Sequence, residues 1–128
     1  MIDDMGIFRT TLGLAAIGTP QERRELVDVM IDTSVVYSWL PGTLLLDLGV
    51  SPVRIDLFET ADGRVLVREV GFVLLYAAGR STATIVVFAQ EGDMVLLGAI
   101  GLKSMGLQVD FVRRELVPAG LVPVALAA

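Results

Sequence analysis

The sequence contains no cysteine and no histidine among its 128 residues. Without cysteine, the chain can form no disulfide bond and offers no thiol nucleophile. Without histidine, it lacks a Ser-His-Asp or Cys-His catalytic site and the usual histidine-rich zinc sites. Any general acid–base chemistry must therefore come from carboxylates, tyrosine or water.

Positive charge is also scarce. Lysine and arginine total 10 against 15 aspartates and glutamates, so the net charge is −5, and Lys103 is the only lysine. The arginines are scattered and form no basic stripe, so we expect no nucleic-acid partner. No glycine-rich phosphate-binding motif occurs, and the acidic residues lack the spacing of a calcium loop. We therefore expect neither cofactor nor metal, and we interpret four of the acidic residues as solvated turn residues: Asp3, Asp4, Glu91 and Asp93.

Long hydrophobic runs are missing, although the chain is apolar overall. No run of about 18 uninterrupted apolar residues occurs, so no membrane-spanning helix is predicted. Apolar residues nevertheless make up 54% of the chain, above the usual share of roughly 45–50%. We expect a subunit interface to cover the excess. A protein bound at a membrane surface is the alternative, and the low positive charge argues against it.

The length of the chain predicts one domain, with its core over about residues 6–118 and an apolar, proline-broken tail over 119–128. The first residues, MIDDMG, are acidic and resemble no signal peptide, so we expect a cytoplasmic protein. β-Branched and apolar patterns predict several short strands and two short helices. The strands are predicted over 7–17, 25–32, 81–89, 94–99 and two segments of 107–118, and the helices over 41–50 and 100–106.

Three local features refine this prediction. A hairpin is expected over 53–77, because Asp-Gly within the ADGR loop is a strong turn signal and the flanking arms alternate. Gly13 is a candidate β-bulge. Alternation within 25–32 is expected to place Val27, Val29 and Ile31 on one face. Many short strands with glycine-rich turns indicate a closed or sandwiched, mainly β domain.

The stretch MIDTSVVYSWLP, residues 30–41, carries Asp32 from an apolar run directly into Thr33 and Ser34. A charge within an apolar strand is costly unless it is paired or used. The simple interpretation is that Asp32 ends the strand as an Asx-turn or helix-capping residue. Tyr37 and Trp39 are interpreted as packing residues beside this loop.

The order of three segments resembles the retropepsin-like aspartic peptidases, the retroviral-type proteases, and most closely their small bacterial members. MIDTSVVYSWLP corresponds to the catalytic loop of that family, and ETADGRVLVREVG (59–71) to its flap hairpin. VLLGAIGLKSMGLQVD (95–110) corresponds to its hydrophobic-hydrophobic-glycine strand and the helix that follows. The resemblance implies a closed β-barrel or sandwich of the acid-protease type, with one or two short helices.

The resemblance also implies an activity. Asp32 would be the catalytic carboxylate, Thr33 would brace its loop across a two-fold axis, and Ser34 would line the site. Peptide hydrolysis of this kind needs two carboxylates, and no other aspartate is followed by a hydroxyl and a small residue. The second would come from another copy, so the protein is expected to be a homodimeric aspartic endopeptidase acting on an extended peptide or protein substrate. The expected substrate-binding residues are Val35, Ala61, Asp62, Gly63, Arg64, Val65, Leu97 and Gly98.

Two residues depart from the pattern of the family. Ser34 stands where glycine is usual, and Val35 is bulkier than the alanine common after that glycine. A serine with negative φ fits this position, and its hydroxyl can join the hydrogen-bond network, whereas a positive φ carries a steric cost. These departures motivate the alternative hypothesis, a catalytically inactive dimer of the same fold that acts as a peptide-binding or assembly module.

Overall fold

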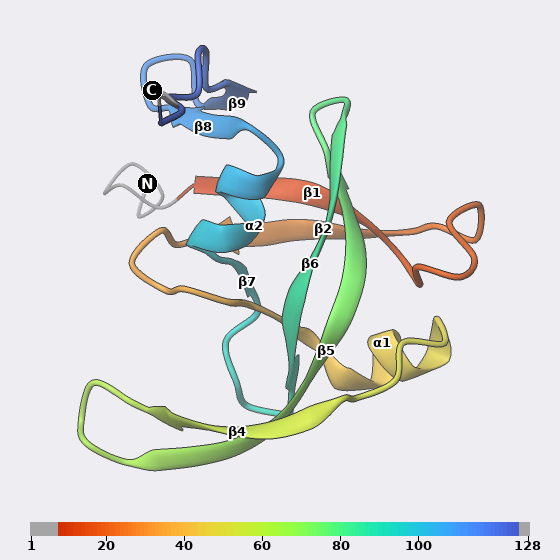
Figure 1. Cartoon of the computed structure of the whole chain (residues 1–128). Coiled ribbons are helices and arrows are strands. Elements are labelled where there is room, and N and C mark those ends of the chain that lie inside the picture. The colour runs from red at the N-terminus through yellow and green to blue at the C-terminus, as the bar shows by residue number, and fades with distance from the viewer. Residues whose placement is uncertain (1–7, 126–128) are drawn as a thin grey trace.

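The computed structural model describes residues 8–125, which form nine strands and two short helices (Figure 1). The prediction of a mainly β fold with two short helices is confirmed. The strands are β1 (Phe8–Ala15), β2 (Arg24–Ile31), β3 (Ser38–Pro41), β4 (Arg54–Glu59), β5 (Val65–Ala77), β6 (Arg80–Ala89), β7 (Leu96–Leu97), β8 (Leu107–Asp110) and β9 (Glu115–Pro118), and the helices are α1 (Gly42–Asp47) and α2 (Ala99–Ser104).

Seven strands form one sheet in the order β1-β2-β7-β3-β6-β5-β4. Because β1 pairs with both β2 and β5, six of these strands close into a ring, and β4 lies outside the ring beside β5. β8 and β9 form a separate two-stranded sheet. The fully buried side chains come from several strands of the ring, which places the core between them; they include Leu12, Leu14, Leu40, Leu75 and Leu97.

The β-bulge lies in β2 and not at Gly13. The register of β1 and β2 shifts between the pairs Thr10–Val29 and Leu12–Leu26, so β2 contains one residue more than its partner strand. Asp28 takes up the extra length with a φ of 56°. The shift breaks the predicted alternation, because a bulge reverses the face on which the preceding side chains lie. Val29 is therefore buried, whereas Val27 is 65% exposed.

Gly13 serves close packing instead. A Cβ atom at this position would lie 2.9 Å from Cδ of Arg23 and 3.0 Å from Cβ of Tyr76. Gly13 pairs with Glu25 of β2 and with Tyr76 of β5, at the place where β1 joins its two neighbours. The glycine thus belongs to the closure of the ring.

The short strand β7 lies between β2 and β3. It is parallel to β2 and antiparallel to β3. The predicted strand over 94–99 is reduced to Leu96–Leu97, because Gly98 already caps α2. Both helices are shorter than predicted, and α2 is followed by Gly106 with a φ of +70°, a conformation that favours glycine after a helix.

The hairpin of β4 and β5 projects from the body of the molecule (Figure 1). Its strands pair in an unbroken antiparallel register from Arg54–Val70 to Glu59–Val65. The intervening residues form the predicted tight turn, in which Gly63 has a φ of +86°. Only glycine adopts this φ at no steric cost, which explains the Asp-Gly pair in the sequence.

No helix in residues 8–125 is long and apolar enough to cross a membrane. The described part of the predicted tail, 119–125, contains neither helix nor strand. Its large side chains are exposed, among them Leu121 and Val124. The acidic residues Asp3 and Asp4 lie outside the described residues.

The bulge in β2 makes a direct prediction about stability. Val29→Ala should lower the free energy of unfolding by about 2 kcal/mol, because it leaves a cavity in the core. Val27→Ala should change it by less than about 0.5 kcal/mol, since that side chain lies in solvent. Urea denaturation of the two variants measures the difference. Equal losses would contradict the register shift at Asp28.

Candidate functional site

Asp32 directly follows β2, and β7 holds its backbone. Ile31 pairs with Leu97, and the Asp32 N–H donates to the Leu97 carbonyl oxygen at 3.0 Å. The side chain is half-buried. The loop that follows is tightly turned, because the Val35 N–H donates back to the Asp32 carbonyl oxygen at 3.2 Å. The strand thus delivers a carboxylate to the surface at a rigidly defined point.

The carboxylate of Asp32 is held by Ser34. Oδ1 accepts a hydrogen bond from the Ser34 backbone N–H at 3.0 Å and another from the Ser34 hydroxyl at 2.6 Å. This is the Asx turn that the simple interpretation of Asp32 predicts. Within residues 8–125, no hydrogen bond reaches Oδ2. One oxygen of Asp32 therefore fixes the side chain, and the other can meet a further group.

Ser34 fits its position without backbone strain. The non-glycine residues with positive φ in the described chain are Asp28, Ala78 and Arg114. Ser34 is not among them, so its Cβ carries no left-handed penalty. Its hydroxyl joins the hydrogen-bond network of Asp32 directly, which is the outcome expected for a serine with negative φ. Thr33, between the two, is exposed.

The residues after β7 support the loop from behind. The Ala99 N–H donates to the Val35 carbonyl oxygen at 2.8 Å, and the Ile100 N–H donates to the Val36 carbonyl oxygen at 3.1 Å. The Gly98 N–H donates to the buried Ser38 hydroxyl at 3.0 Å. Residues 98–100 therefore bind the backbone of the loop at two places and the side chain of Ser38, at the start of β3, at a third.

Gly98 is required by this contact. A Cβ atom there would lie 2.5 Å from the Tyr37 carbonyl oxygen and 2.9 Å from that of Val35. Leu97 beside it is fully buried. The two residues were expected to bind substrate, but the structure places them behind the loop, where they shape its backbone and do not reach the groove described next.

A groove of about 530 Å³ lies between the loop and the β4–β5 hairpin. Of the predicted substrate-binding residues, Val35, Ala61 and Arg64 line it. Asp62 and Gly63 lie in the exposed turn and Val65 on the outer face of the hairpin, and none of these lines the groove. The remaining lining residues are Trp39, Phe58, Glu59, Thr60, Leu66, Gly92, Asp93, Met94 and Leu96.

Aromatic contacts join the hairpin to the loop. The ring of Phe58 lies edge-on to Trp39 at 5.0 Å between centroids, and to Tyr37 at 6.1 Å. Tyr37 and Trp39 are thus packing residues, as predicted, and their partner is the hairpin. Phe58 and Leu66 escaped the sequence analysis, although the alternation in both arms places them opposite each other on one face.

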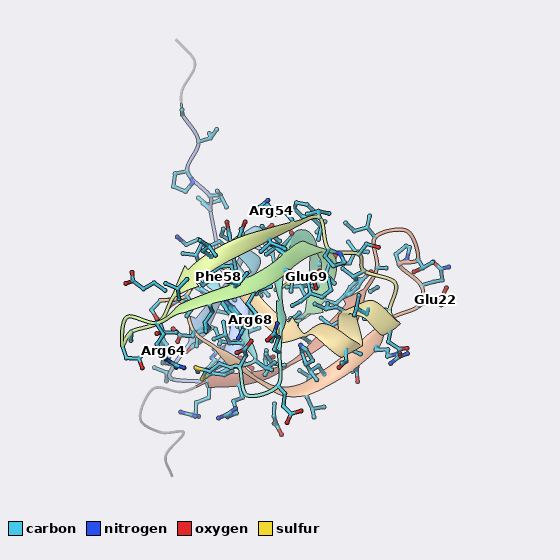
Figure 2. The ribbon with its side chains drawn as sticks, turned by 90° about the horizontal axis from the view of Figure 1, so that it is seen from below. Glu22, Arg54, Phe58, Arg64, Arg68 and Glu69 are labelled. Carbon is cyan, nitrogen blue, oxygen red and sulfur yellow. The ribbon has the colours of Figure 1, made fainter. Side chains whose placement is uncertain are left out.

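The turn of the hairpin is held together internally. The Thr60 N–H donates to the Arg64 carbonyl oxygen at 2.8 Å, and the Arg64 N–H donates to the Thr60 hydroxyl at 2.9 Å. The Thr60 hydroxyl also donates to Asp62, and the Arg64 Nε–H donates to Asp62 Oδ2 at 3.2 Å. These two hydrogen bonds lower the pKa of the Asp62 carboxyl below its ordinary value. Arg64 stands at the tip of the hairpin in Figure 2.

Asp93 is not a solvated turn residue. Arg68 of β5 donates to it twice, from Nε at 2.7 Å and from Nη2 at 2.8 Å. Only 13% of the Arg68 side chain and 10% of the Asp93 side chain are exposed. The Gln90 N–H donates to Asp93 as well, at 2.8 Å. This ion pair ties the hairpin to the 90–95 loop, which forms another wall of the groove.

The ion pair also changes the protonation of Asp93. The hydrogen bonds from Arg68 favour the charged carboxylate and lower its pKa below the ordinary value of 3.8. The pKa of Arg68 is raised by the same hydrogen bonds. Asp93 therefore stays ionised to a lower pH than a free aspartate does.

The comparisons identify no relative. Models of known protein families give no match to the sequence, and curated protein sequences give none either. Within the described residues, no group of three or more histidine, cysteine, aspartate or glutamate side chains could hold a metal ion. The function is therefore inferred from the geometry of Asp32, its loop and the groove.

Gly98→Ala should lower the free energy of unfolding by at least about 2 kcal/mol, because a methyl group cannot fit against the Tyr37 carbonyl. Gly18→Ala is the matched control, since no atom lies within 4 Å of a Cβ atom there. Urea denaturation compares the two. A Gly98→Ala variant as stable as the control would refute the close contact between α2 and the loop.

Asp93→Asn should cost about 3 kcal/mol at neutral pH, because it leaves the charge of Arg68 buried without its partner. The pKa of Asp93 is lowered in the folded state, so its contribution is complete above pH 3.8 and is lost as the pH falls through the folded value. The variant should thus lose the corresponding part of the acid dependence of stability. Asp62→Asn, in an exposed pair, is the control and should change stability little. Denaturation from pH 2 to 7 tests both, and an unchanged acid profile for Asp93→Asn would count against the assignment.

Proposed function

We propose that the protein is a homodimeric aspartic endopeptidase of the retropepsin-like type. One observation carries the proposal: β2 delivers the Asp32 carboxylate to a tightly turned loop, and Val35 of the same loop lines the groove, although Asp32, Thr33 and Ser34 do not. Ser34 holds Oδ1 of this carboxylate and leaves Oδ2 without a hydrogen bond from residues 8–125. The resemblance in the sequence supplies the reaction class, and the ring of six strands is compatible with the acid-protease type of barrel.

The second carboxylate comes from Asp32 of another copy across a two-fold axis. The surface of this loop suits such an interface, because it carries exposed apolar side chains. Val36 is 57% exposed and Ile100 is 40% exposed, and a hydrogen bond links their backbones. A two-fold axis through this surface would cover both apolar side chains of each copy and bring the two Asp32 loops together.

The chemistry follows from two carboxylates that share one proton. Two such groups about 3 Å apart do not both ionise. The ionised carboxylate takes a proton from a water molecule while the oxygen of that water bonds to the carbonyl carbon of the peptide. At the same time the protonated carboxyl group gives its proton to the carbonyl oxygen. When the C–N bond then breaks, the carboxyl group that took the proton from water gives it to the leaving nitrogen, and the other carboxylate takes a proton from a hydroxyl of the tetrahedral intermediate, so the new carboxylic acid forms and the dyad again shares one proton. An optimum below neutral pH follows from this requirement.

An extended peptide is the substrate that suits the groove. Trp39, Phe58, Leu66 and Met94 give its walls an apolar character, while Arg64 and Glu59 stand at the tip of the hairpin. Extended peptides bind such sites through backbone hydrogen bonds and through pockets for alternate side chains. No cofactor takes part in this mechanism, and we place the enzyme in the cytoplasm.

Asp32→Asn should abolish peptide cleavage, with a loss of at least about 10³-fold, because an amide cannot act as the general base. Asp47→Asn is the control, since Asp47 lies on α1 in an exposed ion pair with Arg24. The assay incubates each protein with a mixture of synthetic peptides from pH 4 to 7 and detects products by mass spectrometry. Cleavage by Asp32→Asn at the rate of the control would show that another group is responsible.

A pepstatin-type inhibitor separates the peptidase from an inactive dimer of the same fold. A working dyad should bind this transition-state mimic, which should raise the melting temperature of the native protein and leave that of Asp32→Asn unchanged. A native protein that cleaves none of the peptides and ignores the inhibitor would favour the inactive, peptide-binding alternative.

A further inference from the structure

β4 is an edge strand with one side unpaired. It is the last strand of the seven-stranded sheet, and its pairs in the described chain are all with β5. In Figure 2 it runs along the rim of the hairpin, with Arg54 near one end. A strand in this position presents a row of unsatisfied N–H and C=O groups to any extended chain that approaches.

β4 carries the charged residues Arg54, Asp56 and Glu59 but lacks the other devices that usually protect an edge strand. Its register with β5 contains no bulge, and no proline or lysine lies within Arg54–Glu59. Ile55 is 64% exposed and Leu57 is 70% exposed. Long, regular edges with exposed aliphatic side chains are sites of strand addition. β4 is therefore built to pair with a further strand.

We propose that β4 pairs antiparallel with β4 of a second copy of the chain, with Ile55 opposite the partner's Ile55. In the segment Arg54-Ile55-Asp56, opposite charges lie on the two sides of Ile55, so an antiparallel copy of the segment faces it with opposite charges. In this register Arg54 lies opposite the partner's Asp56, and Asp56 lies opposite the partner's Arg54. Opposite charges that face each other across a strand pair stabilise it.

The charges select this register over its neighbours. A two-fold axis perpendicular to the sheet always places one residue opposite itself, because opposed side chains share a face. With Asp56 on the axis, two carboxylates would face each other, which is destabilising. With Leu57 on the axis, Asp56 would face the partner's Phe58. Of these three registers, the one with Ile55 on the axis places Arg54 opposite the partner's Asp56, and Glu59 lies beyond the paired residues.

The apolar residues agree with the same register. Val53 lies opposite the partner's Leu57 at both ends of the pairing, around the central pair of Ile55 residues. All three side chains are more than half exposed in the single chain. The Val53 N–H already donates to the Val70 carbonyl oxygen at 2.7 Å, and Pro52 beyond it has no N–H, so this end of the pairing offers only carbonyl oxygens to the partner. The result is a short, defined ladder over residues 53–57.

The monomer already prepares the charged pair. Arg54 Nε donates to Asp56 Oδ1 at 2.9 Å, and both side chains remain partly exposed. On pairing, each carboxylate lies between two guanidinium groups, one from each chain. The same strand carries Phe58, which contributes to the groove, so this assembly holds the hairpin and stiffens one wall of the groove.

The experiment measures particle mass by sedimentation velocity over a range of concentrations at low salt. It uses Val36→Lys as the background, because that change places charge in the separate interface proposed around Asp32. In this background the protein should still dimerise through β4. Adding Arg54→Asp should raise the dimer dissociation constant at least about tenfold, because two attractive pairs become repulsive. Adding Asp56→Arg as well should restore it, and adding Ile55→Lys should abolish the dimer. Circular dichroism verifies that each variant is folded.

The two proposed contacts can fail separately. A folded Val36→Lys protein that is monomeric at every concentration overturns the β4 contact. The proposal of a peptidase dimer around Asp32 is unaffected by that result. The β4 contact is also overturned if neither Arg54→Asp nor Ile55→Lys changes the particle mass, both in the native protein and in the Val36→Lys variant. If these variants halve the mass while Val36→Lys has no effect on mass or cleavage, the β4 contact stands and the proposed interface around Asp32 does not.

Discussion

The site depends on the packing of the 32–38 loop against the first turn of α2. Gly98 allows the backbone of that turn to approach the carbonyls of Val35 and Tyr37 more closely than any side chain permits. Three backbone donors in residues 98–100 then satisfy acceptors in the loop. These hydrogen bonds fix the backbone of the loop at Val35, Val36 and Ser38. The position of Asp32 follows from that conformation, because its own N–H is bound by β7 as well.

The inner face of the β4–β5 hairpin forms one wall of the groove and packs against other parts of the chain. This face carries Phe58 against Trp39, and Arg68 against Asp93. The aromatic contact has no strict geometry, whereas the bidentate ion pair is directional and almost fully buried. The hairpin is therefore anchored through Phe58 and Arg68, and the turn beyond them is held by hydrogen bonds among its own residues, Thr60, Asp62 and Arg64.

Local sequence signals predicted the elements well where neighbouring residues decide them. Asp62-Gly63 specified the tight turn of the hairpin, and Gly106 marked the end of α2, because positive φ is a property of a single residue. The sequence failed where the partner strand decides. The bulge at Asp28 arises from the register of β1 against β2, and it turned Val27 outward despite a perfect alternation. Asp93 was interpreted as a solvated turn residue because its partner Arg68 lies 25 positions away in the sequence, and a local pattern contains no information about that contact.

The sequence by itself determined the β character of the chain, the order of its elements and the absence of thiol and imidazole chemistry, since these follow from residue type and spacing. It also singled out Asp32 as a charge in an apolar setting. Only the tertiary structure decided what surrounds that charge. It placed Leu97 and Gly98 behind the loop instead of in the groove, and it moved the ion pair of Arg68 and Asp93 into the wall. The physical reason is that burial and pairing depend on contacts between strands far apart in the chain, and sheet register, not local propensity, sets those contacts.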